Sequence, residues 1–361
     1  MKRAFFVAAA VGLVACSPSD QQERTTTASG CAPTGSAGGV DLTGAGATFP
    51  YPLYSKWFSD YAASTGVKIN YQSIGSGGGI RQLSECTVDF GASDSPMTDE
   101  EMARARGGPV LHIPTVLGAD VITYNIQGLS RPLNLTGEVI ADIFLGRIKK
   151  WNDARIAALN SGVTLPNQDI LVVHRSDGSG TTFIFTDYLS TVSPAWANGP
   201  GRGKEVQWPA GIGAKGNEGV AGQVKQTPGS VGYTELAYAK QNRLPFAAVQ
   251  NAAGEFVLPT VESITAAAAG VMARLPENSD FRLSIVNAPG AAAYPIASFT
   301  WIVLYQNQAD ADKGRKLLDF LRWALREGDA SAAALDYAPL PAAMDERLTK
   351  RLETVNVGPR A

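Results

Sequence analysis

The sequence predicts an α/β fold in which strands alternate with helices and pair largely in parallel. Three features indicate this class: short apolar runs of strand length, amphipathic segments with apolar residues at helical spacing, and glycine-rich turns between them. A length of 361 residues favours two domains or lobes over one. The hydrophobic content of 45% is that of a globular chain with a sizeable core.

The expected elements follow one another in a regular order. Residues 50–63 carry Leu53, Trp57 and Tyr61 at helical spacing, and residues 312–326 form a second amphipathic segment with its leucines on one face. The acidic run after Thr98 predicts a capped helix start. Strands are expected at residues 40–43, 67–73, 88–92, 116–125, 169–174 and 298–305, further helices at residues 80–83, 135–144 and 182–189, and a glycine-rich loop at residues 199–219.

Residues 1–16 have the pattern of an export signal. Two basic residues precede an apolar run over residues 4–14, which is too short to span a bilayer as a helix. The run ends in Leu-Val-Ala-Cys at Cys16, which resembles the bacterial lipoprotein signal and makes Cys16 the expected lipid-bearing residue. A plain secretory signal is the alternative. Residues 17–40 are rich in small and polar residues and are expected to form a flexible tether.

Charge and cysteine usage exclude several classes of partner. The net charge of −2 gives no basic surface of the kind that nucleic acid requires. The histidines, His112 and His174, lie far apart without cysteines at ligand spacing, so we expect no metal site. An exported chain permits a disulfide between Cys31 and Cys86, with two free thiols as the alternative.

Three segments share one design, in which a strand is followed by a tight turn of small residues and a helix start. A helix N-terminus presents unpaired N–H groups and about half a positive charge, which suits an oxyanion. Thr48 and Ser76 add hydroxyl donors, and Arg175 adds a planar, positively charged guanidinium group that can donate two parallel hydrogen bonds. One such turn alone is more often a simple N-cap, but three of matching design predict an oxyanion site. The segments are residues 44–50, 74–79 and 175–182.

Asp94 follows the predicted strand at residues 88–92, at the kind of strand end where open α/β sheets bind ligands. A carboxylate only accepts hydrogen bonds. Protonated phosphate can donate its P–OH to a carboxylate, whereas sulfate has no hydrogen to donate at neutral pH. A site that demands such a bond can reject a ligand lacking it by ~10⁴–10⁵-fold. Asp94 is therefore expected to select a protonated oxyanion, and a helix N-cap is its alternative role.

The chain resembles the periplasmic phosphate-binding proteins of the bacterial phosphate-specific ABC transporter, from about residue 41 to the C-terminus. The matching blocks are residues 42–50, 71–76, 88–94, 145–151, 175–181, 215–219 and 335–341. The resemblance implies a two-lobed solute-binding fold of type II, with a hinge between the lobes and the ligand in the cleft. It implies that residues 41–117 and 296–361 form lobe one and that residues 118–295 form lobe two.

The same resemblance implies the ligand contacts and the partners. Phosphate would be bound by Thr48, Phe49, Ser76 and Asp94 from lobe one, and by Arg175, Ser179, Gly180 and Thr181 from lobe two, with Asp177 orienting Arg175. The implied protein is a monomer without cofactors that captures inorganic phosphate outside the cytoplasmic membrane and delivers it to the permease subunits of an ABC importer. A lipid anchor on Cys16 would affect its location rather than its chemistry.

Two other function classes compete with this one. A secreted phosphatase would need a metal cluster or an activated nucleophile, and the sequence has no Gly-x-Ser-x-Gly motif. Residues 211–216 match Gly-x-Gly-x-x-Gly, but Trp208 and Pro209 before them make a poor strand, so neither a dinucleotide site nor an enzyme is expected. A surface-exposed sensor or adhesin that reuses the binding fold stays open.

Overall fold

The computed structural model describes residues 30–32, 39–129, 131–272, 275–276 and 279–358. The predicted export signal, Cys16 and most of the predicted tether lie outside the described residues. Within these ranges, no helix combines the length and the apolar character that a bilayer crossing requires.

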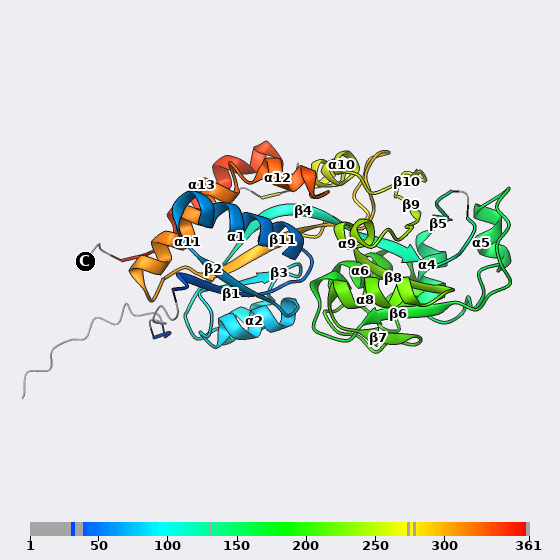
Figure 1. The fold of residues 1–361 in the computed structure, drawn as a ribbon, viewed down its shortest axis with the longest axis horizontal. Coiled ribbons are helices and arrows are strands. Elements are labelled where there is room, and N and C mark those ends of the chain that lie inside the picture. Colours follow the sequence, from blue (N-terminus) through cyan, green and yellow to red (C-terminus); the bar gives the residue numbers. More distant parts are fainter. Residues whose placement is uncertain (1–29, 33–38, 130, 273–274, 277–278, 359–361) are drawn as a thin grey trace, which may run out of the picture.

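An eight-stranded sheet runs through the whole molecule in the order β2-β1-β3-β11-β4-β8-β6-β7 (Figure 1). Its strands are β1 (Leu42–Gly46), β2 (Ile69–Ser73), β3 (Phe90–Ser93), β4 (Val110–Tyr124), β6 (Leu171–Arg175), β7 (Ile212–Ala214), β8 (Ser230–Glu235) and β11 (Ala297–Tyr305). A small second sheet contains β5 (Asn134–Leu135), β9 (Ala248–Gln250) and β10 (Phe256–Val257).

The strand directions divide the large sheet into three parts. At one end β2, β1 and β3 pair in parallel, and at the other end β8, β6 and β7 do the same. The middle pairs β3–β11, β11–β4 and β4–β8 are antiparallel. The expectation of a largely parallel sheet is therefore right at both ends and wrong in the middle, because β4 and β11 carry the chain between the two ends in opposite directions.

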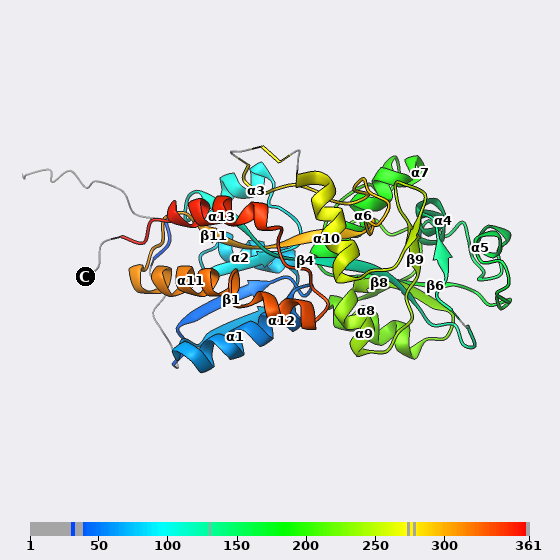
Figure 2. The ribbon, with the colours of Figure 1, turned by 90° about the horizontal axis from the view of Figure 1, so that it is seen from above.

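Helices cover the two ends of the sheet as two lobes (Figures 1 and 2). The first lobe, around β1 to β3, has α1 (Tyr51–Thr65), α2 (Ser76–Ser84), α3 (Asp99–Arg104), α11 (Ala311–Ala324), α12 (Asp329–Ala334) and α13 (Asp345–Glu353). The second lobe, around β6 to β8, has α4 (Gly137–Phe144), α5 (Ala154–Leu159), α6 (Gly180–Val192), α7 (Pro194–Ala197), α8 (Gly216–Gln226) and α9 (Leu236–Gln241). The helix α10 (Val261–Met272) packs on β4 and β11, which join the lobes.

Local sequence signals explain where several helices begin and end. Helix α1 starts with a proline in its first turn and ends at Gly66, whose φ of 78° favours glycine. Helix α3 starts with the predicted cap, a capping box between Thr98 and Glu101. The expected loop at residues 199–219 is partly wrong, because β7 and the start of α8 lie within it. Strand β7 has three residues and lies at the edge of the sheet, next to β6. Such a short edge strand shows no alternation of apolar and polar residues from which it could be predicted.

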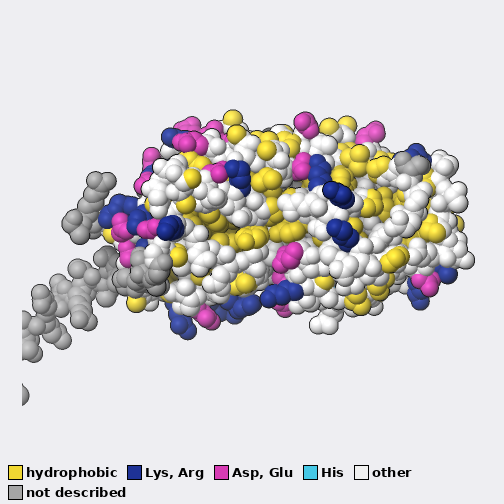
Figure 3. Space-filling model, in the orientation of Figure 1, with side chains coloured by type: hydrophobic (Ala, Val, Ile, Leu, Met, Phe, Trp, Pro, Cys, Tyr) yellow, Lys and Arg dark blue, Asp and Glu magenta, His cyan; other side chains and the backbone are white. Residues whose placement is uncertain are grey.

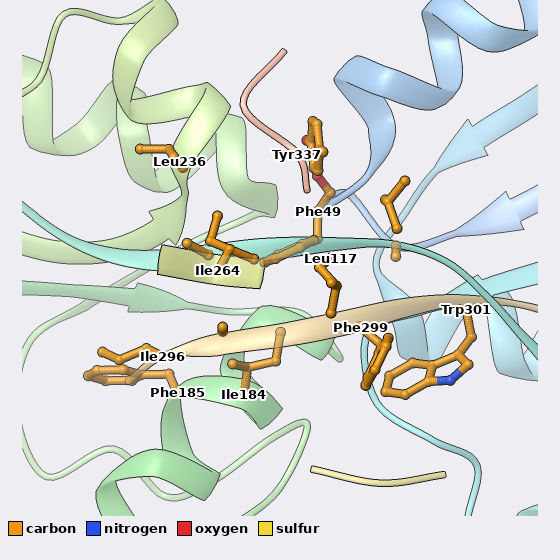
Figure 4. Close-up of a cluster of buried hydrophobic side chains, with 14 of the residues drawn as sticks. Phe49, Leu117, Ile184, Phe185, Leu236, Ile264, Ile296, Phe299, Trp301 and Tyr337 are labelled. Carbon is orange, nitrogen blue, oxygen red and sulfur yellow. The ribbon is translucent and has the colours of Figure 1, made fainter. Parts of the chain in front are cut away.

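A buried apolar cluster fills the space where β4 and β11 cross between the lobes (Figure 4). A third segment reinforces the crossing, since Leu117 and Ala338 exchange two backbone hydrogen bonds of 2.9 Å each. The core is thus continuous from one lobe to the other, and burial of each large side chain contributes about 1.5–3 kcal/mol. The labelled members of the cluster are Phe49, Leu117, Ile184, Phe185, Leu236, Ile264, Ile296, Phe299, Trp301 and Tyr337.

Cys31 and Cys86 form a disulfide with a Cα–Cα distance of 5.5 Å. This outcome confirms the bonded alternative over two free thiols. The bond ties the start of the described chain to the segment just after α2, across a sequence separation of 55 residues.

Replacing Cys31 and Cys86 together by serine should lower the free energy of unfolding by about 2–4 kcal/mol, because the bond restricts the unfolded chain. Denaturant unfolding under oxidising conditions measures the difference. The wild type in reductant should fall to the stability of the double variant. Identical unfolding midpoints with and without reductant would contradict this expectation.

Candidate functional site

The three predicted turns converge where the two lobes meet. In the first lobe, the turns after β1 and β2 lead into α1 and α2, and Asp94 directly follows β3. In the second lobe, the turn after β6 leads into α6, whose N-cap is Ser179. All eight predicted contact residues are buried in this structure: Thr48, Phe49, Ser76, Asp94, Arg175, Ser179, Gly180 and Thr181.

Ser76 joins the two lobes through hydrogen bonds. Its Oγ accepts the N–H of Gly180 from the second lobe at 3.1 Å and the N–H of Asp94 from the first lobe at 3.2 Å. The same hydroxyl donates to Asp94 Oδ2 at 3.3 Å. Beside them, the N–H of Gly77 donates to the carbonyl of Gly178 across the lobes at 2.8 Å. The starts of α2 and α6 therefore face each other directly.

Arg175 is held in place by a bidentate ion pair with Asp177. Its Nε donates to Asp177 Oδ1 at 2.8 Å, and its Nη2 donates to Oδ2 at 2.6 Å. Burial opposes ionisation of Asp177, but the hydrogen bonds and charge of Arg175 outweigh it and lower the pKa of the carboxyl. The Nη1 of Arg175 donates to Thr181 Oγ1 at 3.3 Å. The geometry is that required for Asp177 to orient the guanidinium.

Asn217 is a site residue to which the sequence analysis gave no role. Its Nδ2 donates to Thr48 Oγ1 in the first lobe at 2.7 Å and to Thr181 Oγ1 in the second lobe at 3.0 Å. Its Oδ1 accepts from Thr234 Oγ1 and from the N–H of Glu235, each at 3.0 Å. The one available signal was its place in the matching block at residues 215–219.

Three tyrosine hydroxyls bind consecutive carbonyl oxygens of the first turn. A carbonyl oxygen repels an anion. Because each of these oxygens accepts a hydrogen bond from a tyrosine, the N–H groups are the side of this turn that can attract an anion. The donors come from three separate parts of the chain and include α9 of the second lobe. Tyr71 donates to the oxygen of Ala47 at 2.8 Å, Tyr238 to that of Thr48 at 2.6 Å and Tyr337 to that of Phe49 at 2.7 Å.

Asp94 is a buried carboxyl with donors on both oxygens. Thr300 donates to its Oδ1 at 2.7 Å, opposite the contact of Oδ2 with Ser76. Burial raises the pKa of Asp94 to about 7, against the opposing effects of Thr300, Arg175 and Ser76. The alternative role of a helix N-cap is wrong, because the next helix is α3 and Thr98 caps it.

Charges of both signs are mixed on the visible surface of the molecule (Figure 3). On the face shown in Figure 3, Lys and Arg side chains are interspersed with Asp and Glu. His112 accepts the N–H of Met97, whereas His174 precedes Arg175 on β6, stacks on Trp208 and contacts the backbone oxygen of Arg175 at 3.0 Å. Among the described residues, no three His, Cys, Asp or Glu side chains are grouped to hold a metal ion.

Sequence comparison places the chain in a family of known proteins. Residues 21–327 match the PBP superfamily domain. Over 353 residues the chain is 46% identical to the phosphate-binding protein PstS of Xylella fastidiosa strain 9a5c, covering 95% of this chain and 94% of that protein. This chain belongs to the PstS family. It is also 47% identical over 314 residues to PstS of Pasteurella multocida, covering 87% of this chain and 90% of that protein.

Solved structures confirm the two-lobed type II fold of this PstS-family chain. One is a high-affinity periplasmic phosphate-binding protein with bound phosphate, with a TM-score of 0.70 and 22% identity over 89% of this chain and 100% of that chain. Another is a phosphate-binding protein from Stenotrophomonas maltophilia, with a TM-score of 0.66 and 23% identity over 86% of this chain and 93% of that chain. The relatives carry the names of binding proteins rather than enzymes.

Gly180→Ala should lower the free energy of unfolding by about 1–3 kcal/mol, the usual cost of overpacking. A Cβ at this position would lie 2.4 Å from Ser76 Oγ and 2.5 Å from Asp94 Oδ2. Denaturant unfolding measures the change. The control is Gly222→Ala in α8, where an added Cβ has no described atom within 4 Å and alanine should stabilise the helix. If both variants gained the same free energy of unfolding, the lobes would not meet at Gly180 in solution.

Proposed function

We propose that this chain binds inorganic phosphate between its lobes outside the cytoplasmic membrane and delivers it to an ABC importer. The observation that carries the proposal is that the start of α6 in the second lobe meets the buried acceptor of the first lobe: Gly180 N–H donates to Ser76 Oγ, and Ser76 and Thr300 donate to Asp94. Its PstS relatives are named phosphate-binding proteins, and the similar structures include one with phosphate bound. An oxyanion that brings its own hydrogen is the ligand that this set of groups suits.

The proposed ligand contacts divide by charge. Hydroxyls of Thr48, Ser76 and Ser179, together with the N–H groups of Phe49, Gly180 and Thr181, supply neutral donors at helix starts. Arg175 supplies the one positive charge among the proposed contacts, and Asp94 accepts the hydrogen of the ligand. Phosphate binding would exchange the cross-lobe bonds of Ser76 and Asn217 for bonds to the ligand, so that the ligand links the lobes.

We propose a hinge at the crossing strands, with lobe one formed by residues 41–117 and 296–361 and lobe two by residues 118–295. The change of partner along β4 supports these bounds: Val110–Ala119 pair with β11, and Asp120–Tyr124 pair with β8. Short strand segments that join two packed lobes are a common site of closure around a ligand.

We further propose that the chain is exported and held to a membrane by a lipid on Cys16, and that it acts as a monomer without a cofactor and without enzymatic activity. The support is the signal pattern of residues 1–16 and the small, polar composition of residues 17–40. The lipid would keep the binding lobes close to the permease subunits.

Calorimetric titration with phosphate, sulfate and arsenate tests the proposed function. The wild type should bind phosphate, and Arg175→Ala should weaken binding by roughly 10²–10³-fold, because it removes the one positive charge among the proposed contacts and leaves the partly buried Asp177 without its partner. The matched control is Arg322→Ala on the exposed face of α11, which should bind like the wild type. Unchanged phosphate affinity in Arg175→Ala would refute its role, and hydrolysis of a phosphoester by the wild type would favour an enzyme.

Asp94→Asn should allow sulfate to bind, because an amide can donate where a carboxylate can only accept. With the pKa of Asp94 raised to about 7, the carboxylate form predominates above pH 7 and the neutral form below it. Sulfate affinity of the wild type should therefore rise as the pH falls through 7, whereas Asp94→Asn should bind sulfate across this range. Competition titrations from pH 6 to 8.5 measure the sulfate affinity of the wild type and of Asp94→Asn. If Asp94→Asn does not bind sulfate, another residue determines the selectivity. Asp319→Asn, at an exposed position, serves as the control.

A further inference from the structure

Two buried carboxyls outside the proposed ligand contacts face each other across the hinge strands. Asp120 of β4 and Glu235 of β8 are directly opposite each other in the antiparallel ladder. Both residues are completely buried. Directly opposite residues of such a ladder point to the same face and have Cβ atoms about 4.5–5.5 Å apart. The two carboxyl groups therefore occupy one small buried region.

These carboxyls have few hydrogen-bond donors. Within the described part of the chain, three of their four oxygens have no hydrogen-bond partner: both of Asp120 and Oε1 of Glu235. Two ionised carboxylates in this position would repel each other and would both lack solvation. A proton on one carboxyl removes a charge and supplies a donor for the other. Pairs of this kind in other proteins hold one proton between them.

The remaining oxygen, Glu235 Oε2, has donors. It accepts the N–H of Ala237 at 2.8 Å as the N-cap of α9, and the hydroxyl of Tyr337 at 3.0 Å. The hydroxyl of Tyr337 also donates to the carbonyl oxygen of Phe49 at 2.7 Å. The tyrosine thereby connects the acid pair to the turn that contributes Thr48 and Phe49.

We propose that Asp120 and Glu235 act as a proton-sharing acid pair and that phosphate binding draws a further proton into this pair. The proposal rests on the proposed function. The pair would hold one proton when the cleft is open to solvent and two when phosphate is bound. Phosphate affinity would then depend on pH through residues that do not touch the ligand.

The charges around the pair give the direction of the effect. Burial is the main cause that raises the pKa of both carboxyls well above the usual range. Around Asp120, Arg175 of β6 opposes this rise and Asp94 after β3 adds to it, and the hydroxyls of Tyr233 and Tyr294 are also close. Around Glu235, Tyr337 opposes the rise by hydrogen bonding and Asp336 adds to it.

A bound anion adds negative charge beside the pair and engages Arg175, the cation that favours the ionised form of Asp120. The proton affinity of the pair should therefore increase when phosphate binds. By linkage, phosphate affinity should increase as the pH falls, by up to about tenfold per pH unit for each proton taken up. The backbone offers a second connection, because the N–H of Glu235 donates to Asn217 Oδ1.

Proton uptake can be measured by titrating phosphate into the full-length protein in buffers of different ionisation enthalpy, at pH 7 and pH 8. The slope of the observed enthalpy against the buffer enthalpy gives the number of protons taken up. Asp120→Asn keeps the shape of the side chain but cannot ionise. On binding phosphate it should therefore take up fewer protons than the wild type, with a difference of at most about one proton. Its phosphate affinity should also fall less steeply from pH 7 to pH 8. Titration of phosphate and of Asp94 contributes to both proteins, so the difference reports the acid pair.

Two further variants complete the test. Glu235→Gln should show the same reduced uptake, and it replaces Asp120→Asn if thermal unfolding shows that Asp120→Asn is not folded. Asp329→Asn in α12 is the matched control, since burial also raises the pKa of Asp329, and it should take up as many protons as the wild type.

The outcomes separate this proposal from the proposed function. No phosphate binding by the wild type would refute the proposed function. Phosphate binding with equal proton uptake in the wild type, Asp120→Asn and Glu235→Gln would refute the acid pair alone. Replacing sodium and potassium by choline should leave the wild-type affinity unchanged. A loss of affinity in choline that is absent in Asp120→Asn would mean that the pair holds a metal cation instead of a proton.

Discussion

The antiparallel pairing of β4 with β11 is the constraint on which both lobes depend. These strands carry the chain between the lobes, and their buried cluster makes one continuous core (Figure 4). Strand β11 also pairs with β3, which places Asp94 at the end of its strand, and β4 continues into the ladder with β8 that holds Asp120 opposite Glu235. A change in this crossing would therefore move the site acceptor and the acid pair together.

The site combines one buried cation with several buried acids. Arg175 is paired with Asp177, while burial raises the pKa values of Asp94, Asp120 and Glu235. Neutral donors at helix starts and the charge of Arg175, rather than a large excess of positive charge, then make the centre suitable for an anion. This arrangement fits the net charge of −2 and the mixed charges on the surface in Figure 3.

Local patterns made much of the fold and of the site predictable. The three turns were found because each strand, turn and helix start is encoded within about ten residues of sequence, and the structure brings all three together. Asn217 and the Asp120–Glu235 pair were not found, because their importance arises from long-range pairing. In the sequence Asp120 is simply one polar residue in an apolar strand. The antiparallel centre was missed for the same reason, since strand direction is set by connections of more than a hundred residues.

The tyrosines on the first turn have a consequence for closure of the lobes. Tyr238 belongs to α9 of the second lobe, yet its hydroxyl covers the carbonyl oxygen of Thr48 in the first lobe. Separation of the lobes would withdraw this hydroxyl and leave that oxygen facing the cleft. In the open form, water would hydrogen-bond to this oxygen in place of Tyr238. The hydrogen bond from Tyr238 would thus form only on closure, so the first turn reaches its full set of donors when the lobes meet.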